Sequence, residues 1–312
     1  LGKIYSVHLK VIDTLSEGFG AVNRRLWIIA IPILFDLFLW LGPKATVGPH
    51  LAQLLQAGFP AQYSSYGPLI QQTIATFNLF SLAAIYLPSL VVRLDTTPLS
   101  SLTANLALNT PGIFLAAALV TTLAGLWLSC LYLGLVAQLV RDGATNVRVL
   151  ARAVWRYWRR LIAFLVVVIA ALALGAIPFG LLYLVLASFS ATAGEVMAFV
   201  LQIALIWVVV YLFFSIEALL LSDVGPLQAI RLSVVVIAGN FWAALTLIGL
   251  TFLITLGLPL AWQLIAQYPA GLVAGIIGNA YIGTGVAAAG FLFYKERLER
   301  LTAAAKTTQE LR

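Results

Sequence analysis

Residues 161–190 read LIAFLVVVIAALALGAIPFGLLYLVLASFS, thirty consecutive positions without a charged side chain. An α-helix of about 20 apolar residues crosses the hydrocarbon core of a bilayer, so this stretch is long enough to span it with some tilt. The rest of the chain has a similar composition, since 62% of its 312 residues are hydrophobic and only 9% are charged. Soluble domains carry roughly a quarter charged residues. We therefore expect one membrane domain, residues 1–312, rather than a soluble fold.

Apolar runs of spanning length recur along the chain. The first, 26–42, is just long enough to cross and has Trp27 and Trp40 near its ends, where aromatic side chains anchor helices at the membrane interfaces. The later runs are 112–140, 161–190, 196–221, 241–266 and 271–294. The pattern predicts an all-α, polytopic membrane protein with six transmembrane helices.

Residues 43–111 contain seven of the chain's twelve prolines, a density that breaks long helices. Within this region, 69–92 is apolar enough to suggest another span, but Asn78 and Pro88 interrupt it. If it crossed, the basic stretch 141–160 would lie on the opposite side from the basic N-terminus, contrary to the positive-inside rule. We therefore predict that 43–111 is an outer-side segment of surface or re-entrant helices.

Positive charge predicts the orientation of the chain. With the N-terminus inside, sixteen of the eighteen Lys and Arg residues fall on the inner side, and only Lys44 and Arg93 fall outside. This orientation predicts a cell-membrane protein with both termini in the cytoplasm. The net charge of +7 comes from short clusters between apolar runs, which disfavours nucleic acid as a partner and favours anionic lipid headgroups.

Three segments are typical of helices that lie on the membrane surface, namely 1–25, 141–160 and 222–240. The second has an apolar face that includes Leu150 and Val154, and a basic face at helical spacing. The basic residues expected to face the headgroups are Arg148, Arg152, Arg156, Arg159 and Arg160. The tail that follows the last run, 295–312, is also basic.

Each predicted surface helix precedes two spans, so the chain divides into three units of similar order. The first span of each unit ends in a pattern of Gly and Pro. These patterns are Leu41-Gly42-Pro43, Gly175-Ala176-Ile177-Pro178 and Gly257-Leu258-Pro259. They indicate three repeated units of a surface helix plus a hairpin, with chance recurrence of Gly and Pro in apolar sequence as the alternative.

The stretch from Glu217 to Trp242 contains Gly225-Pro226, Ala229-Ile230-Arg231, Ser233 and Gly239-Asn240-Phe241-Trp242. This pattern resembles six-helix membrane proteins of bacteria and archaea that are grouped with the membrane domain of glycerophosphodiester phosphodiesterases. The resemblance covers the second half of the chain and implies the same architecture of surface helices and hairpins. The family's function is mostly unassigned. The 312 residues contain no soluble phosphodiesterase domain, so we expect no such activity.

Three polar side chains within the predicted spans are candidate functional groups: Asp36, Glu217 and Asn279. Charged side chains are costly inside a membrane, so by default they indicate substrate or ion pathways. The structural alternatives are that Asp36 bonds backbone groups freed by Pro32, and that Glu217 pairs with Arg231 or with headgroups. The two carboxylates are predicted near opposite faces of the membrane, which disfavours a shared proton path.

Small residues recur every four positions along the last predicted span, namely Gly271, Gly275, Gly283 and Ala287, with Asn279 between them. Such a ridge lets two helices approach closely. It predicts either packing inside this chain or an interface with a partner protein, and both interpretations stay open at this point.

Groups for catalysis and cofactor binding are scarce. The chain has two histidines, His8 and His50, both outside the predicted spans, and one cysteine, Cys130. It contains no zinc-protease, nucleotide-loop or nucleophile-elbow motif, so we expect no catalytic residues, no metal and no cofactor.

The leading hypothesis is a non-catalytic structural or assembly subunit of a larger membrane complex, with membrane lipids and other membrane subunits as partners. The alternative is a small transporter or lipid-handling protein, in which Asp36, Glu217 and Asn279 would line a path.

Overall fold

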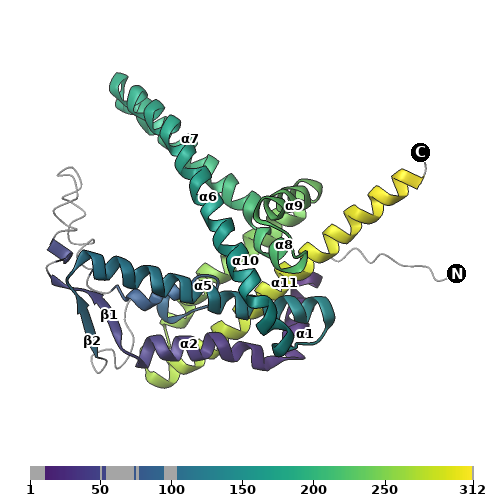
Figure 1. The fold of residues 1–312 in the computed structure, drawn as a ribbon, viewed down its shortest axis with the longest axis horizontal. Helices are drawn as coiled ribbons and strands as arrows, with labels where there is room; N and C mark the ends of the chain where they lie inside the picture. The colour runs from purple at the N-terminus through teal and green to yellow at the C-terminus, as the bar shows by residue number, and fades with distance from the viewer. Residues whose placement is uncertain (1–10, 50, 54–73, 75–76, 95–103, 311–312) are drawn as a thin grey trace. The chain divides into compact units, whose positions relative to one another are not determined.

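The computed structural model describes residues 11–49, 51–53, 74, 77–94 and 104–310, which divide between two compact units (Figure 1). Unit 1 contains Leu1–Ala21, Ala137–Thr251 and Val286–Arg312. Unit 2 contains Val22–Val136 and Phe252–Gly285.

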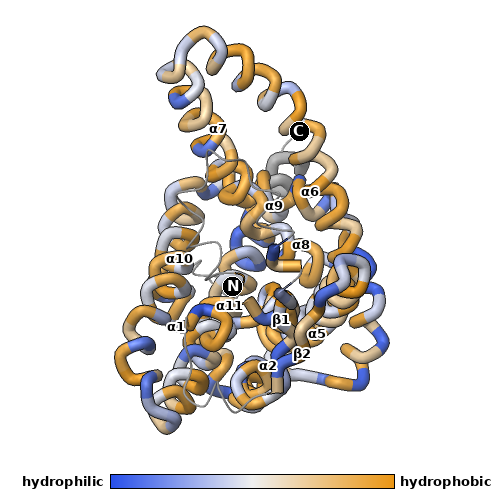
Figure 2. The backbone as a smooth tube through the Cα atoms, turned by 90° about the vertical axis from the view of Figure 1, so that its left-hand side faces the viewer, coloured by the Kyte–Doolittle hydropathy of each residue, from blue (hydrophilic) through white to orange (hydrophobic). Residues whose placement is uncertain are grey.

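Unit 1 is helical throughout its described part. Its helices are α1 (Val11–Asn23), the end of α5 (Pro111–Asp142), α6 (Val147–Phe189), α7 (Ala191–Leu212), α8 (Ser215–Leu221), α9 (Pro226–Gly239), the start of α10 (Phe241–Gln263) and the end of α11 (Pro269–Glu310). Asn146 begins α6, because its side-chain oxygen accepts a hydrogen bond from the Val149 N–H at 3.1 Å. Helices α6 and α7 pack against each other as a hairpin that is mostly hydrophobic along its length (Figure 2).

Unit 2 combines helices with short irregular elements. These are η1 (Leu26–Ile29), α2 (Ala30–Leu41), β1 (Lys44–Val47), η3 (Leu79–Ala84), η4 (Val91–Arg93), β2 (Asn105–Leu108), most of α5 (Pro111–Asp142), and the adjoining parts of α10 and α11. Strands β1 and β2 pair in parallel, from Lys44 opposite Asn105 to Val47 opposite Leu108. Apolar side chains of α2, η4 and the start of α11 form a core that includes Trp40, Leu90 and Ile276.

Five helical stretches are long and apolar enough to cross a membrane: α5, α6, Ala191–Leu221 (α7 with α8), α10 and Pro269–Ala303 of α11. The fold is therefore that of a helical, multi-pass membrane protein, as the composition predicts. The first predicted span, 26–42, is instead the shorter apolar stretch Leu26–Leu41, which begins with one turn of 3-10 helix.

Several predicted helix boundaries are wrong. The surface helix predicted in 141–160 and the span 161–190 belong to one continuous helix, α6, which has no glycine or proline before Gly175. The basic tail likewise continues α11 as far as Glu310. The predicted span 196–221 is interrupted at Phe213 and Phe214, between α7 and α8.

The fold is predominantly helical, as expected, with one short pair of strands, β1 and β2, in the proline-rich region. One further expectation is corrected. The Gly/Pro patterns do not end three spans alike: Gly42 follows the end of α2, whereas Pro178 and Pro259 lie inside α6 and α10. A membrane helix continues through a proline when neighbouring groups satisfy the carbonyl that proline leaves free.

Candidate functional site: an irregular segment held by three helices

Residues 85–90 of unit 2 form an irregular segment between η3 and η4. Tyr86 has a φ of 63°, in the left-handed region, and Pro88 lacks an N–H group. Ser89 and Leu90 are nevertheless buried. Backbone groups that are buried outside a helix need other hydrogen-bond partners, so the partners of this segment show what holds it.

One polar side chain from each of three helices bonds the segment. Asp36 on α2 accepts the Ser89 hydroxyl through Oδ1 and the Leu90 N–H through Oδ2, the latter at 2.8 Å. Ser129 on α5 donates to the Ile85 carbonyl. Asn279 on α11 donates its Nδ2 to the Pro88 carbonyl at 3.0 Å. Two of the three polar candidates from the sequence therefore meet on the same segment.

Glycines let two of the three helices, α5 and α11, approach this part of the chain. A Cβ atom placed on Gly283 would lie 2.3 Å from Cβ of Pro88, and one on Gly275 would lie 2.9 Å from Cδ2 of Leu90. A Cβ atom on Gly125 of α5 would lie 2.3 Å from Cα of Ala83 in η3. Two glycines of the predicted ridge thus already contact the chain's own segment.

The other two ridge positions have different surroundings. A Cβ atom on Gly271 would lie 1.9 Å from the Ile265 carbonyl oxygen, so this glycine allows the tight turn between α10 and α11. Ala287 is half-buried and belongs to unit 1.

The chemistry of this site is that of a structural clamp. Asp36 is fully buried, and each of its carboxylate oxygens accepts a hydrogen bond. Hydrogen bonds to an ionised acceptor are about twice as strong as neutral ones, and they offset the cost of burying the charge. The sequence suggested that Asp36 bonds backbone groups freed by Pro32 in the same helix. Its hydrogen-bond partners are instead Ser89 and Leu90, which lie 53 and 54 residues further along the chain.

Ser129 and Gly125 could not be identified from the sequence. A serine within an apolar helix ordinarily bonds the carbonyl one turn earlier, so Ser129 carried no signal of a distant partner. Gly125 stands outside the four-residue ridge of the last span. The buried hydroxyl groups of Tyr132 and Thr284 lie 2.9 Å apart, and neither residue carried a signal in the sequence of its distant partner.

Glu217, the third candidate, lies in unit 1 on α8, next to the interruption that separates α7 from α8. Ser233 of α9 bridges this interruption, because its Oγ accepts the Phe214 N–H at 3.1 Å and donates to the Tyr211 carbonyl at 2.7 Å. Within the described residues, neither Glu217 nor Arg231 forms an ion pair, so the predicted pairing of these two is not present.

Replacing Ser233 by alanine removes both hydrogen bonds at the α7–α8 interruption. We expect a loss of about 1–3 kcal/mol in the free energy of unfolding, because a buried N–H is left without an acceptor. Thermal unfolding of the purified protein in detergent measures the change. Ser188→Ala, at an exposed serine near the end of α6, is the matched control and should change the free energy by less than about 0.5 kcal/mol. Equal effects of the two substitutions would contradict the bridging role of Ser233.

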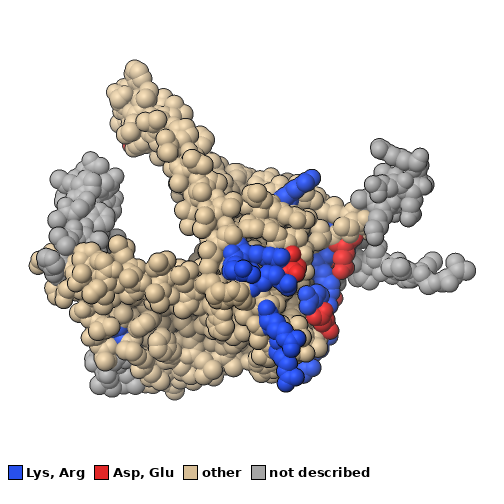
Figure 3. Space-filling view, in the orientation of Figure 1, with Lys and Arg blue, Asp and Glu red and all other residues tan. Residues whose placement is uncertain are grey.

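The basic residues predicted to face headgroups lie at the start of α6. Arg156 and Arg160 both pair with Asp223, at 3.2 and 2.5 Å, whereas Arg148, Arg152 and Arg159 are exposed. On the face that Figure 3 shows, most of the visible Lys, Arg, Asp and Glu side chains lie in one region, and none is visible on the protruding part of the α6–α7 hairpin; Glu195, near the start of α7, is exposed.

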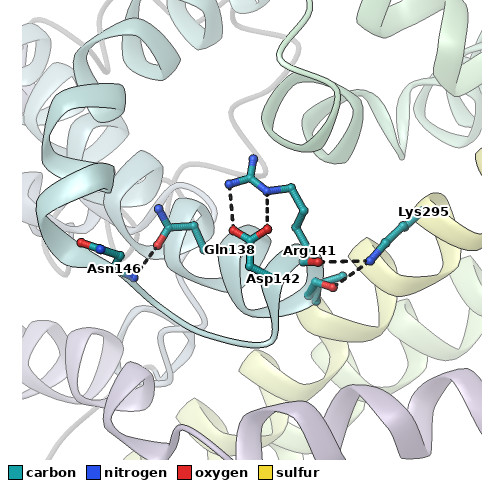
Figure 4. A network of polar contacts seen from close by, with 6 residues as sticks. Gln138, Arg141, Asp142, Asn146 and Lys295 are labelled. Atoms are coloured by element: carbon teal, nitrogen blue, oxygen red, sulfur yellow. Dashed lines mark hydrogen bonds and ion pairs between the residues drawn. The ribbon is translucent and has the colours of Figure 1, made fainter.

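A second polar network fixes the end of α5 in unit 1 (Figure 4). Lys295 donates to the carbonyls of Val140 and Arg141 at 3.2 and 3.4 Å, which places a cation at the negative end of the helix dipole. Arg141 and Asp142 pair at 3.0 Å, and Gln138 accepts the Asn146 N–H at 3.0 Å.

Among the described residues, no group of three His, Cys, Asp or Glu side chains is arranged to hold a metal ion. Comparison of the chain with protein-family models, with curated proteins and with solved structures finds no match in any of the three. The resemblance of residues 217–242 to phosphodiesterase membrane domains therefore stays a prediction.

Proposed function

We propose that this chain is a non-catalytic membrane protein that serves as a structural or assembly subunit, with a helix of another membrane protein packed on the α6–α7 hairpin. The observation that carries the proposal is the exposure of the hairpin. In the most apolar 18-residue stretch of each helix, only 11% of the residues of α6 and 6% of those of α7–α8 are buried, against 56% of those of α11.

Exposed apolar surface alone does not bring membrane helices together, because lipid tails are equally apolar. Small residues that allow close backbone contact do so. On α6, Gly175 and Gly180 have no neighbouring atom within 4 Å of the place where a Cβ would lie, and Ala171 and Ala176 precede them by four residues. Both positions on α6 are open, whereas Gly275 and Gly283 of α11 are covered by the chain itself.

The clamp in unit 2 also supports a structural role. Asp36 and Asn279 bond backbone and hydroxyl groups of their own chain, which ties both side chains to the irregular segment. This arrangement favours a rigid support over a solute path.

The proposal includes six membrane crossings with both termini in the cytoplasm. Leu26–Leu41 is about 26 Å long because its first turn is an extended 3-10 helix, close to the roughly 30 Å of a hydrocarbon core. Residues 77–94 would then be re-entrant. Pro88 of this segment lies against Gly283, which is about 21 Å along α11 from its outer end at Pro269 and therefore well inside the membrane. The exposed arginines at the start of α6 would face anionic headgroups.

Native mass analysis after extraction in a mild detergent tests the proposal. We expect the chain to travel with a second membrane protein at a fixed stoichiometry, and the double substitution Gly175→Leu and Gly180→Leu to lower the amount of that partner by roughly tenfold. Thermal stability of the chain itself should not change, because both positions are open. Gly249→Leu, at an equally open position on α10, is the control and should keep the partner. A chain that travels alone, or only with copies of itself, would exclude the assembly role.

A small transporter is the second candidate, and the two irregular places in the helices favour it. Transporters place interrupted helices at their binding sites, and here residues 85–90 and the α7–α8 interruption are of that kind. Solute uptake by reconstituted vesicles that is abolished by Asp36→Asn, in protein that remains folded, would favour transport over assembly.

A further inference from the structure

Glu217 is the one polar candidate that the clamp and the bridge at Ser233 leave unexplained. It lies in the first turn of α8 and faces α11 within unit 1. A Cβ atom placed on Gly290 would lie 3.1 Å from Oε1 of Glu217, so the absence of a side chain at position 290 makes room for the carboxyl group.

The second oxygen of this carboxyl group, Oε2, is enclosed and has no hydrogen-bond partner among the described residues. Phe214 and Ala218, which flank Glu217 along the chain, are buried, and so is Phe293, whose ring stacks on that of Phe214. The Tyr294 hydroxyl interacts electrostatically with Glu217 but is hydrogen-bonded to Ser222 at 2.9 Å.

The charged and titratable groups of the elements packed around α8 are engaged elsewhere or form no ion pair with Glu217. On α11, Glu296 pairs with Arg300, and the buried Arg297 lies over the ring of Phe293, 5.1 Å from its centroid. Arg156 and Arg160 of α6 pair with Asp223, and Lys295 of α11 bonds the end of α5. Tyr157 of α6 is buried, and Arg231 of α9 forms no ion pair in the described part of the chain.

An ionised carboxylate without a partner is strongly destabilised in such a place. A proton bound to Oε2 removes the charge and is small enough to need no cavity. We propose that Glu217 is a proton-binding site, which holds its proton at neutral pH, whereas Asp36 is held as the ion by two donated hydrogen bonds. This inference goes beyond the assembly role and does not depend on it.

Labelling with dicyclohexylcarbodiimide, an apolar reagent that adds to protonated carboxyl groups, tests the proposal on the full-length protein in lipid vesicles. Peptide mass analysis should find the reagent on Glu217 and at least about tenfold less on Asp36 at neutral pH. Labelling of Glu217 should fall about tenfold per pH unit once the pH exceeds the value at which the proton is lost. A water-soluble carbodiimide should label exposed carboxyl groups in preference to Glu217, since Oε2 is enclosed.

Infrared spectroscopy provides a second readout that needs no reagent to reach the site. The carbonyl stretch of a protonated carboxylic acid should be present in the wild-type protein and absent from Glu217→Gln, which keeps the size of the side chain. Asp36→Asn should leave this band in place. Absence of both the label and the band at neutral pH, or equal labelling of the two carboxyl groups, would overturn the proposal.

Discussion

Replacing Asp36 by alanine is expected to lower the free energy of unfolding by about 3–5 kcal/mol, which corresponds to a fall on the order of 10 °C in the unfolding midpoint. The substitution leaves the Leu90 N–H and the Ser89 hydroxyl buried without the acceptors that hold the irregular segment. Thermal unfolding of the purified protein in detergent measures the effect.

Three further variants make this prediction specific. Asp36→Asn should cost less than half as much, because its carbonyl oxygen can still accept the Leu90 N–H while its amide donates to Ser89. Asp142→Asn, at an exposed carboxylate paired with Arg141, should cost less than about 0.5 kcal/mol. The double mutant of Asp36→Ala with Ser89→Ala should cost less than the sum of the single changes, because the two side chains share one interaction. A wild-type unfolding temperature for Asp36→Ala would show that the clamp does not support the fold.

Alanine at Gly283 or Gly125 is expected to destabilise unit 2 by about 1–3 kcal/mol or more each. The new methyl group would meet the rigid ring of Pro88 in the first case and the backbone of Ala83 in the second, each at 2.3 Å, so the segment or the helix must move. Gly275→Ala should cost less, because its methyl group meets only the flexible end of Leu90 at 2.9 Å. Thermal unfolding in detergent measures all three.

Gly249→Ala is the matched control, because no atom lies within 4 Å of its Cβ position. It should be neutral or slightly stabilising, since alanine favours a helix more than glycine does. If Gly283→Ala behaved like Gly249→Ala in the isolated protein and instead released a partner, the ridge would be an external interface. The predicted order of effects therefore separates internal packing from partner binding.

Part of the clamp could be predicted from the sequence. The high cost of a carboxylate in an apolar run singled out Asp36, and the four-residue spacing of small residues singled out Gly275 and Gly283. Each signal is a local property of a single helix, α2 for Asp36 and α11 for the two glycines. Ser129 and Gly125 gave no such signal, because a lone serine or glycine in an apolar helix has many ordinary explanations.

The points at which helices end were predicted less well from the sequence. The change from basic to apolar residues near 160 suggested a surface helix followed by a span, but a change of composition does not end a helix, and α6 continues through it. The interruption between α7 and α8 contains neither glycine nor proline. It is stabilised by Ser233 from another helix, which local sequence does not reveal.

By itself, the sequence determined the class of this protein and the position of its main apolar helices. The free energy of transferring a side chain from water to lipid depends mainly on that side chain, so these free energies can be summed along a stretch of chain. Only the tertiary structure decided which polar groups meet. Asn279 bonds a carbonyl 191 residues away and Asp36 bonds groups 53 and 54 residues away, and a hydrogen bond depends on the positions of both partners in space.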